Sequence, residues 1–284
     1  MFRLALSPRL LALLLALLVL AACSRLELVY RNLDWLIPWK LDDYLSLDAT
    51  QSAWLDARLD EHLAWHCRHE LPRYLDWLER QRPLLAGSPG ADRLKAPLLE
   101  ARSLLQPTLE RVAPDAAHLL ARLDAAQVDE LDENLAAERA ELHERFLGGT
   151  PQERLQRRVE RMEQRLESWL GPLYPQQRAY LRFWAARQEA GVRPWLEFRQ
   201  RWQAQLLTEL RRPSGDRAAR LLPLLGDPER YGGEDYRQAA ERARQALADL
   251  LSELWASATA DQRVHLMQRL DRLRDDLAGL PCRS

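Results

Sequence analysis

Three of the six histidines lie within eight residues of one another, in a stretch whose apolar spacing predicts a helix. His62, His66 and His69 occupy positions i, i+4 and i+7, so their rings would project from one helix face. Imidazole is a common ligand of zinc and copper, and three rings on one face could converge on a single metal ion. The segment lacks a His-Glu-x-x-His pattern, so it indicates metal binding without hydrolysis. The alternative interpretation is a polar helix face whose rings make local contacts.

The cysteines allow one disulfide. If Cys23 is modified, as argued below, Cys67 and Cys282 remain, and they would pair in an oxidising compartment. Such a bond would restrict the unfolded chain by roughly 5 kcal/mol in the entropic description. Spacing alone does not show that the two thiols meet. The alternative is a small buried apolar side chain at Cys67 and a free thiol near the C-terminus.

Motifs for catalysis are missing from the sequence. No glycine-rich phosphate loop, nucleophile elbow or kinase signature occurs. The many carboxylates fall on arginine-rich segments, where pairing or solvation is the simplest expectation. Basic and acidic residues are balanced, 41 against 42, without a basic block that would follow a phosphate backbone. We therefore predict a protein that is not an enzyme, needs no cofactor and does not bind nucleic acid.

The N-terminus has the pattern of a secretory signal. Arg3 and Arg9 precede an apolar run of about ten residues, which is too short to span a membrane. The run ends in Leu20-Ala21-Ala22-Cys23, which resembles the lipobox of bacterial lipoproteins. In that class the signal is cut before the cysteine, whose thiol and new amine become acylated. The resemblance implies a signal peptide at 1–22, lipidation of Cys23 and attachment to the membrane through that lipid.

The residue after the cysteine bears on the destination. In lipoproteins of this kind an aspartate there often marks retention in the inner membrane, and this chain has Ser24. The resemblance therefore implies an outer-membrane lipoprotein that faces the periplasm. The anchored segment 23–47 is rich in aromatic residues, which could lie in the headgroup layer or form the first part of the core. We favour the core, because acidic residues interrupt any membrane-facing side.

The elements that must position these residues are predicted to be α-helices throughout. Glycine is scarce, leucine, alanine, arginine and glutamate are abundant, and no alternating strand pattern is found. We expect an all-α bundle or array of about nine helices in the periplasmic domain, 48–284, with 211–233 as loop and short turns. Pro38 should end the first helix and Pro72 should kink or break the second. The predicted inward-facing residues are Leu55, Leu59, Leu63, Leu131, Leu135, Val159, Leu166, Trp202, Leu250 and Leu270.

Four of the predicted helices begin alike. Gln51, Gln127, Gln177 and Gln262 each precede a leucine by four residues, and in three cases an Asp or Thr stands three residues before the glutamine. This is the spacing of a capping box, which stabilises a helix by about 1 kcal/mol. The pattern also resembles the Leu-Thr-x-x-Gln motif of the Spy and CpxP class of periplasmic helical chaperones. Those proteins hold unfolded clients on a helical surface without ATP.

A second resemblance covers nearly the whole chain. The lipobox, the segments 30–36 and 41–45, His66-Cys67-Arg68 and Leu71-Pro72-Arg73-Tyr74 are similar to a family of proteobacterial lipoproteins known as a domain of unknown function. The family implies an envelope lipoprotein and supplies no activity. We predict a non-enzymatic scaffold that engages another envelope protein or an unfolded client. The alternative is a periplasmic metal-binding protein that uses His62, His66 and His69.

Overall fold

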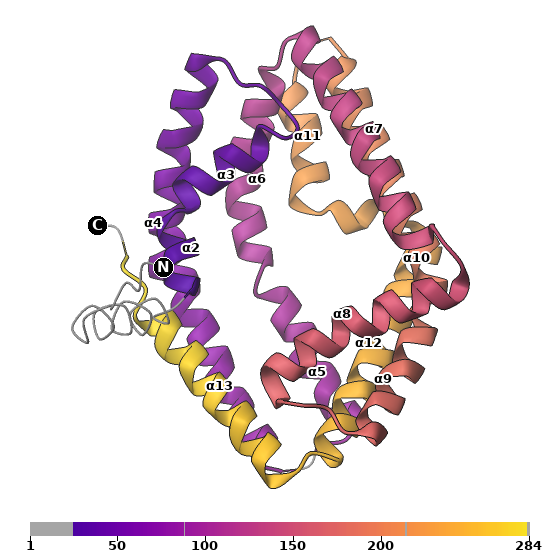
Figure 1. Cartoon of the computed structure of the whole chain (residues 1–284). Helices are drawn as coiled ribbons and strands as arrows, with labels where there is room; N and C mark the ends of the chain where they lie inside the picture. Colours follow the sequence, from indigo (N-terminus) through magenta and orange to yellow (C-terminus); the bar gives the residue numbers. More distant parts are fainter. Residues whose placement is uncertain (1–24, 88, 214, 283–284) are drawn as a thin grey trace, which may run out of the picture.

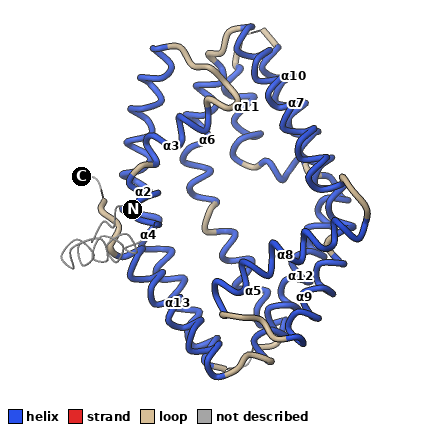
Figure 2. The backbone as a smooth tube through the Cα atoms, viewed as in Figure 1, coloured by secondary structure: helices blue, strands red, loops and turns tan. Residues whose placement is uncertain are grey.

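The computed structural model describes residues 25–87, 89–213 and 215–282, and within them all regular structure is helical (Figure 2). The predicted all-α class is therefore confirmed. The predicted signal peptide and Cys23 lie outside the described residues. The helices are α2 (Arg25–Arg31), α3 (Leu33–Leu41), α4 (Ala49–Ala86), α5 (Ala91–Ser103), α6 (Gln106–Ala121), α7 (Ala125–Leu147), α8 (Pro151–Leu170), α9 (Pro175–Arg187), α10 (Glu189–Arg211), α11 (Arg217–Gly226), the 3₁₀ turn η1 (Pro228–Tyr231), α12 (Gly233–Ala256) and α13 (Ala260–Ala278).

These described helices outnumber the nine or so that we predicted. The stretch 211–233 is not mainly loop, because it contains α11, whose Leu221 and Leu224 are buried. Pro38 does not end its helix, because α3 continues past it, and α4 is not broken at Pro72. A proline removes only one backbone hydrogen bond, and the tertiary packing of α4 around buried Leu71 keeps that helix continuous.

The described helices form an elongated ring built from two halves with the same order of elements (Figure 1). Each half has a long first arm, two connecting helices and a last helix. These are α4, α5, α6 and α7 in the first half, and α9 with α10, α11, α12 and α13 in the second. The halves also pack alike across the ring: α7 lies on α10 as α13 lies on α4, and α6 lies on α11 as α5 lies on α12. The fold is therefore a repeated helical arrangement, with α8 joining the halves.

Equivalent joints close the two halves. At the first, the amides of Gln51 on α4 and Gln127 on α7 donate to each other, with Nε2–Oε1 distances of 3.0 and 2.7 Å. At the second, Gln177 on α9 and Gln262 on α13 do the same at 2.9 and 3.0 Å. Each Oε1 also accepts the N–H of the residue three positions earlier. Each glutamine thus caps its own helix and joins it to the N-terminus of another.

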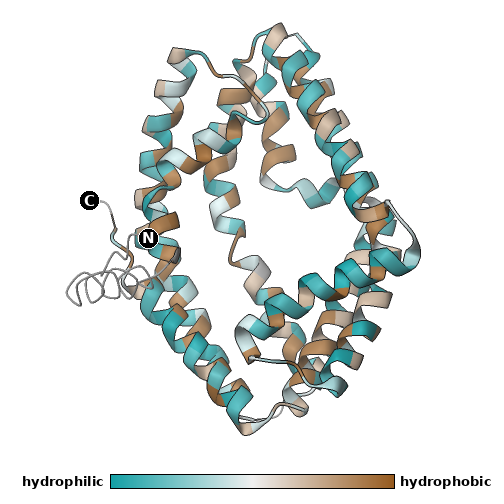
Figure 3. Ribbon diagram, in the orientation of Figure 1, coloured by the Kyte–Doolittle hydropathy of each residue, from teal (hydrophilic) through white to brown (hydrophobic). Residues whose placement is uncertain are grey.

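The core follows the ring and is divided into clusters, as expected for amphipathic helices whose apolar and polar residues alternate along their length (Figure 3). One cluster lies at the first joint, a second at the other joint, and a small third one surrounds Cys67. Every residue that we predicted to face inward is buried or half-buried. Among the described helices none is long and apolar enough to span a membrane.

Candidate functional site

A cavity of about 680 Å³ opens where the C-terminal end of α7, the middle of α8, the junction of α9 with α10, and α12 meet. Its charged lining comes mainly from α8. Arg158, Arg161 and Arg165 follow one another at i, i+3 and i+7, so they share one face of this helix. Arg145 of α7 and Arg244 of α12 complete the basic rim. We call this site the α8 pocket.

Small residues explain why space remains between the helices at this point. Gly191 on α10 faces Ala239 on α12, and a methyl group added to the glycine would lie 4.0 Å from the alanine Cβ. Ala240 and Ala243 continue the same side of α12 into the lining. Side chains this short allow the helices to approach while leaving the volume above them unfilled. The floor of the α8 pocket is therefore apolar and narrow.

Aromatic rings form the walls. Phe146 and Trp195 meet edge to face, with their ring centroids 5.2 Å apart. The guanidinium groups of Arg145 and Arg161 lie 5.8 and 5.7 Å from the centre of the Phe146 ring. Such cation–π contacts hold guanidinium groups over an aromatic face while leaving their N–H donors available to a ligand. The α8 pocket thus combines an apolar surface with oriented cations.

The positive charge of the α8 pocket is only partly neutralised. Arg158 donates to Glu189 at 2.7 Å, and Arg244 pairs with Glu241 at 2.7 Å. Within the described part of the chain, Arg145, Arg161 and Arg165 form no ion pair. Burial and the neighbouring charges of Arg145, Arg158, Arg157 and Arg165 lower the pKa of Arg161. Arginine nevertheless stays protonated in proteins, so the repulsion favours binding of an anion.

Two buried donors in the same lining also lack acceptors. Among the residues that the structure describes, neither Trp184 Nε1 nor Gln188 Nε2 has a hydrogen-bond partner. A buried polar group without a partner costs about 1–3 kcal/mol, and a ligand that brings an acceptor recovers it. Together with the unpaired arginines, these donors make the α8 pocket suited to a group with both acceptor oxygens and apolar surface.

The local sequence accounts for the rigidity of this site. The chain turns between α9 and α10 at Gln188, and the carbonyl of Ala185 at that turn accepts a hydrogen bond from Arg158 Nη1 at 2.9 Å. Arg154 and Arg158 both hold the Glu189 carboxylate. Burial raises the pKa of Glu189, but hydrogen bonds from Arg158 and Arg154 outweigh burial and leave the pKa below its usual value. A charged network therefore ties α8 to the start of α10 beside the α8 pocket.

The three histidines predicted as metal ligands are not brought together. His62 Nε2 lies 2.8 Å from Asp115 Oδ2, and His69 Nδ1 lies 3.0 Å from the Trp65 carbonyl. His66 lies between the hydroxyl groups of Tyr30 and Tyr74, at 3.1 and 3.3 Å. No group of three or more His, Cys, Asp or Glu side chains in the described residues is placed to hold a metal ion. Although the i, i+4, i+7 spacing places the three rings on one helix face, each ring contacts a different partner, so the rings do not converge on one point.

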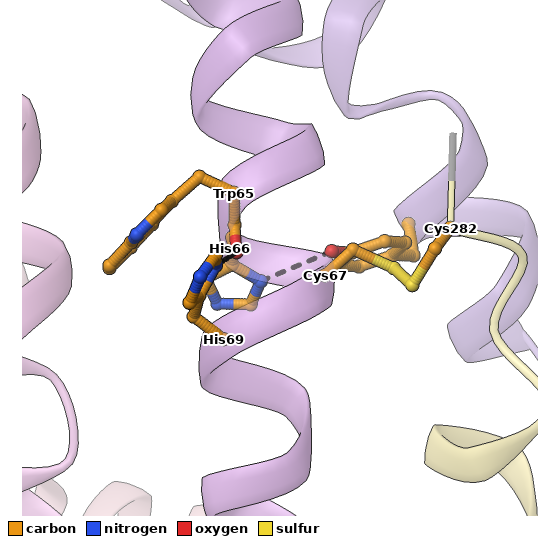
Figure 4. The surroundings of a disulfide bond; sticks show 6 residues. Trp65, His66, Cys67, His69 and Cys282 are labelled. Atoms are coloured by element: carbon orange, nitrogen blue, oxygen red, sulfur yellow. Dashed lines mark hydrogen bonds between the residues drawn. A yellow bond between two sulfur atoms is a disulfide. The ribbon is translucent and has the colours of Figure 1, made fainter. Parts of the chain in front are cut away.

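The two remaining cysteines do meet. A disulfide joins Cys67 on α4 to Cys282 on the segment after α13, with the Cα atoms 5.4 Å apart (Figure 4). Leu71 and Leu280 are buried beside it, and Tyr30 of α2 packs on the same cluster. The bond fastens the end of the ring to its first long arm. The lipidation predicted at Cys23 falls outside the described residues.

The four glutamines of the repeated helix start have a structural role in this fold. Gln51, Gln177 and Gln262 are buried, and all four form the helix joints described above. They are therefore not available to contact a client. The α8 pocket itself was missed at the sequence level, although the spacing of Arg154, Arg158, Arg161 and Arg165 along one predicted helix face was a signal that could have drawn attention to it.

Comparison with known proteins gives one match. A model for a family of unknown function (DUF6279) matches residues 43–237. This stretch includes the first joint, α8 and most of the lining of the α8 pocket. Neither a curated protein nor a solved structure matches the chain.

Proposed function

We propose, from the premise that this chain belongs to the family of unknown function DUF6279, that it is a lipid-anchored, non-enzymatic binding protein of the bacterial cell envelope. In this proposal Cys23 carries acyl chains in the outer membrane and the helical ring faces the periplasm. The ring binds another envelope protein, and the α8 pocket takes an acidic segment of that partner.

The observation that supports this function most strongly is the unneutralised charge beside an apolar floor. Arg145, Arg161 and Arg165 form no ion pair in the described chain and surround aromatic and alanine side chains. Arginine recognises carboxylates through paired N–H donors, and aromatic and arginine side chains are frequent energetic centres of protein interfaces. A glutamate or aspartate next to an aromatic or aliphatic residue would satisfy both parts of the site.

The size of the cavity favours a defined segment. About 680 Å³ accommodates a few side chains, and the orphaned donors of Trp184 and Gln188 fit backbone or carboxylate oxygens at particular places. A site with fixed donors discriminates against segments that leave those donors unpaired. We therefore place a dedicated partner ahead of general capture of unfolded chains, for which the buried Gln51, Gln177 and Gln262 supply no exposed surface.

Calorimetric titration tests the proposal with a synthetic peptide that has two glutamates flanked by phenylalanine and leucine. The double variant Arg161→Gln with Arg165→Gln should weaken peptide binding about tenfold or more, because each substitution removes a charge-assisted hydrogen bond to the peptide. Ala243→Leu should also weaken it by filling the floor while all arginines remain. The matched control removes the same charge from two exposed arginines elsewhere, Arg93 and Arg272.

The control should bind the peptide as the unaltered protein does. Equal weakening in the control would mean that net charge, and not the α8 pocket, attracts the peptide. One equivalent of zinc or copper per purified chain, lost in His66→Ala, together with no peptide binding would contradict the proposal in favour of a metal-binding protein.

A further inference from the structure

The helix α3 is apolar but is not covered by the rest of the described protein. Its sequence, LDWLIPWKL, is apolar on nearly all sides, yet the helix has no buried residue. A helix that is apolar all round is normally enclosed by protein or by lipid. Trp35 and Trp39 are 61% and 55% exposed, so our expectation that the aromatics of segment 23–47 belong to the core was wrong for these two, whereas Tyr30 and Tyr44 pack against buried clusters.

The exposed surface continues onto α2. Leu28 and Val29 of that helix are exposed, as is Ile37 on α3. The rings of Trp35 and Trp39, one helical turn apart, stack with their centroids at 5.9 Å. We call the exposed residues Leu28, Val29, Trp35, Ile37 and Trp39 the N-terminal apolar face. Trp35 and Trp39 share one side of α3 and Ile37 lies on the other, so apolar surface surrounds this helix, and exposed apolar surface of this kind marks an interaction site.

The other side of the same helices is attached to the ring. Tyr30 of α2 contacts His66 of α4 with its hydroxyl, and its ring packs on the cluster around Cys67 and Leu280. α2 also lies against α13, and α3 lies against α4. The N-terminal apolar face is therefore held in a fixed orientation relative to the ring. Trp35 and Trp39 border a small hollow that they share with Asp56 and Asp60 of α4.

The position of this face along the chain identifies what covers it. Only Ser24 separates Cys23 from Arg25, where α2 begins, and a step of two positions spans at most about 7 Å. A helix rises about 1.5 Å per residue, so Leu28 lies within roughly 12 Å of Cys23 along the chain. If Cys23 carries acyl chains in a bilayer, Leu28 at the start of the N-terminal apolar face is held close to the surface of that bilayer, and α3 follows within a few residues.

From this placement we infer that the N-terminal apolar face lies in the headgroup layer of a phospholipid bilayer, with Trp35 and Trp39 inserted at the boundary with the acyl chains. This inference rests on the lipid anchor of the proposed function. α3 has nine residues, which suits an interfacial helix and not a spanning one. Tryptophan favours this layer because its ring is apolar and its N–H finds acceptors there. Ion pairs such as Lys40 with Asp43, at 2.6 Å, keep the edge of the N-terminal apolar face polar.

Quenching by brominated phospholipids tests the inference on the purified, lipidated full chain in vesicles of phosphatidylethanolamine and phosphatidylglycerol. Bromine near the headgroups should quench tryptophan fluorescence more than bromine near the bilayer centre. Trp35→Phe with Trp39→Phe should remove most of that quenching, and folding should be unaffected because both rings are exposed. The control Trp195→Phe, in the α8 pocket, should leave the quenching unchanged.

The outcomes separate the face from the anchor. A chain that floats with the vesicles but whose quenching is the same with and without Trp35 and Trp39 retains the anchor and contradicts the membrane-facing surface. A chain that does not float with the vesicles contradicts both. Flotation together with loss of quenching in the double variant supports the inference.

Discussion

The side-chain amides of Gln177 and Gln262 are hydrogen-bonded to each other in both directions, with Nε2–Oε1 distances of 2.9 and 3.0 Å. Both residues are buried, and Gln262 Nε2 also donates to the Pro172 carbonyl at 2.9 Å. The pair joins the N-termini of α9 and α13. Because Gln51 and Gln127 repeat the arrangement at the other joint, closure of each half depends on one amide pair.

We predict that Gln177→Ala lowers the free energy of unfolding by about 1–3 kcal/mol, since it leaves the buried amide of Gln262 without its partner. Urea denaturation followed by circular dichroism measures the change. Gln156→Ala, on the exposed side of α8, is the matched control and should change stability by less than about 0.5 kcal/mol. The double variant with Gln262→Ala should lose less than the sum of the single losses; strict additivity would show that the two amides do not interact.

The disulfide between Cys67 and Cys282 encloses a sequence separation of 215 residues. Replacing both cysteines by serine should destabilise the protein by about 2–5 kcal/mol. Mass spectrometry of the unreduced protein should find one linked peptide containing both cysteines. Recovery of two alkylated thiols from native protein without reductant would contradict the bond.

Stability should fall between neutral and mildly acidic pH because of His66. Burial lowers the pKa of His66, and the opposing charge of Glu70 does not compensate. The folded pKa lies below the unfolded value of 6.5, so the unfolded state takes up the proton first. The neutral ring carries no penalty above pH 6.5, and stability is lost as the pH falls through 6.5 toward the folded pKa.

Urea midpoints at pH 7.5 and pH 5.5 measure this effect. His66→Gln keeps a hydrogen-bonding side chain between Tyr30 and Tyr74 and removes the titration, so it should show a smaller drop between the two pH values. An identical drop in both proteins would mean that other groups govern the pH dependence.

Helix starts and apolar stripes were predictable because they depend on local spacing. Asp48, Asp124 and Thr259 each cap a helix with the glutamine three residues later, as their sequence pattern indicates. The pairing of those glutamines was not predictable, since it depends on which helix N-termini the ring brings together. α11 was missed because the prolines and glycines around it resemble a loop, whereas burial of Leu221 and Leu224 stabilises the helix.

The candidate site shows the same limit. Arginine spacing along α8 follows from the sequence, but the cavity requires Gly191 on α10 to face Ala239 on α12, which only the tertiary structure reveals. For the histidines, the sequence suggested a site that the tertiary contacts do not assemble. The three rings do start from one helix face, but His62 contacts Asp115 and His66 contacts Tyr30, each on a different helix.

Removal of the predicted lipid attachment should release the protein from the membrane. Cys23→Ala leaves no thiol for acylation at that position, so the chain should move from the membrane fraction to the fraction extracted by high salt or carbonate. Wild-type protein should remain with the outer membrane after density separation. A Cys23→Ala chain that stays as tightly bound as the wild type would contradict the anchor.

Photo-crosslinking in intact cells tests most directly whether the α8 pocket binds a protein partner. A photoreactive amino acid at position 192, where a valine lines the cavity, should capture a discrete envelope protein, and Arg161→Gln should strongly reduce the yield. The same residue at position 93, on an exposed part of α5, serves as the control and should not capture that protein. Capture of the same proteins at both positions, or of none at position 192, would contradict a partner-binding α8 pocket.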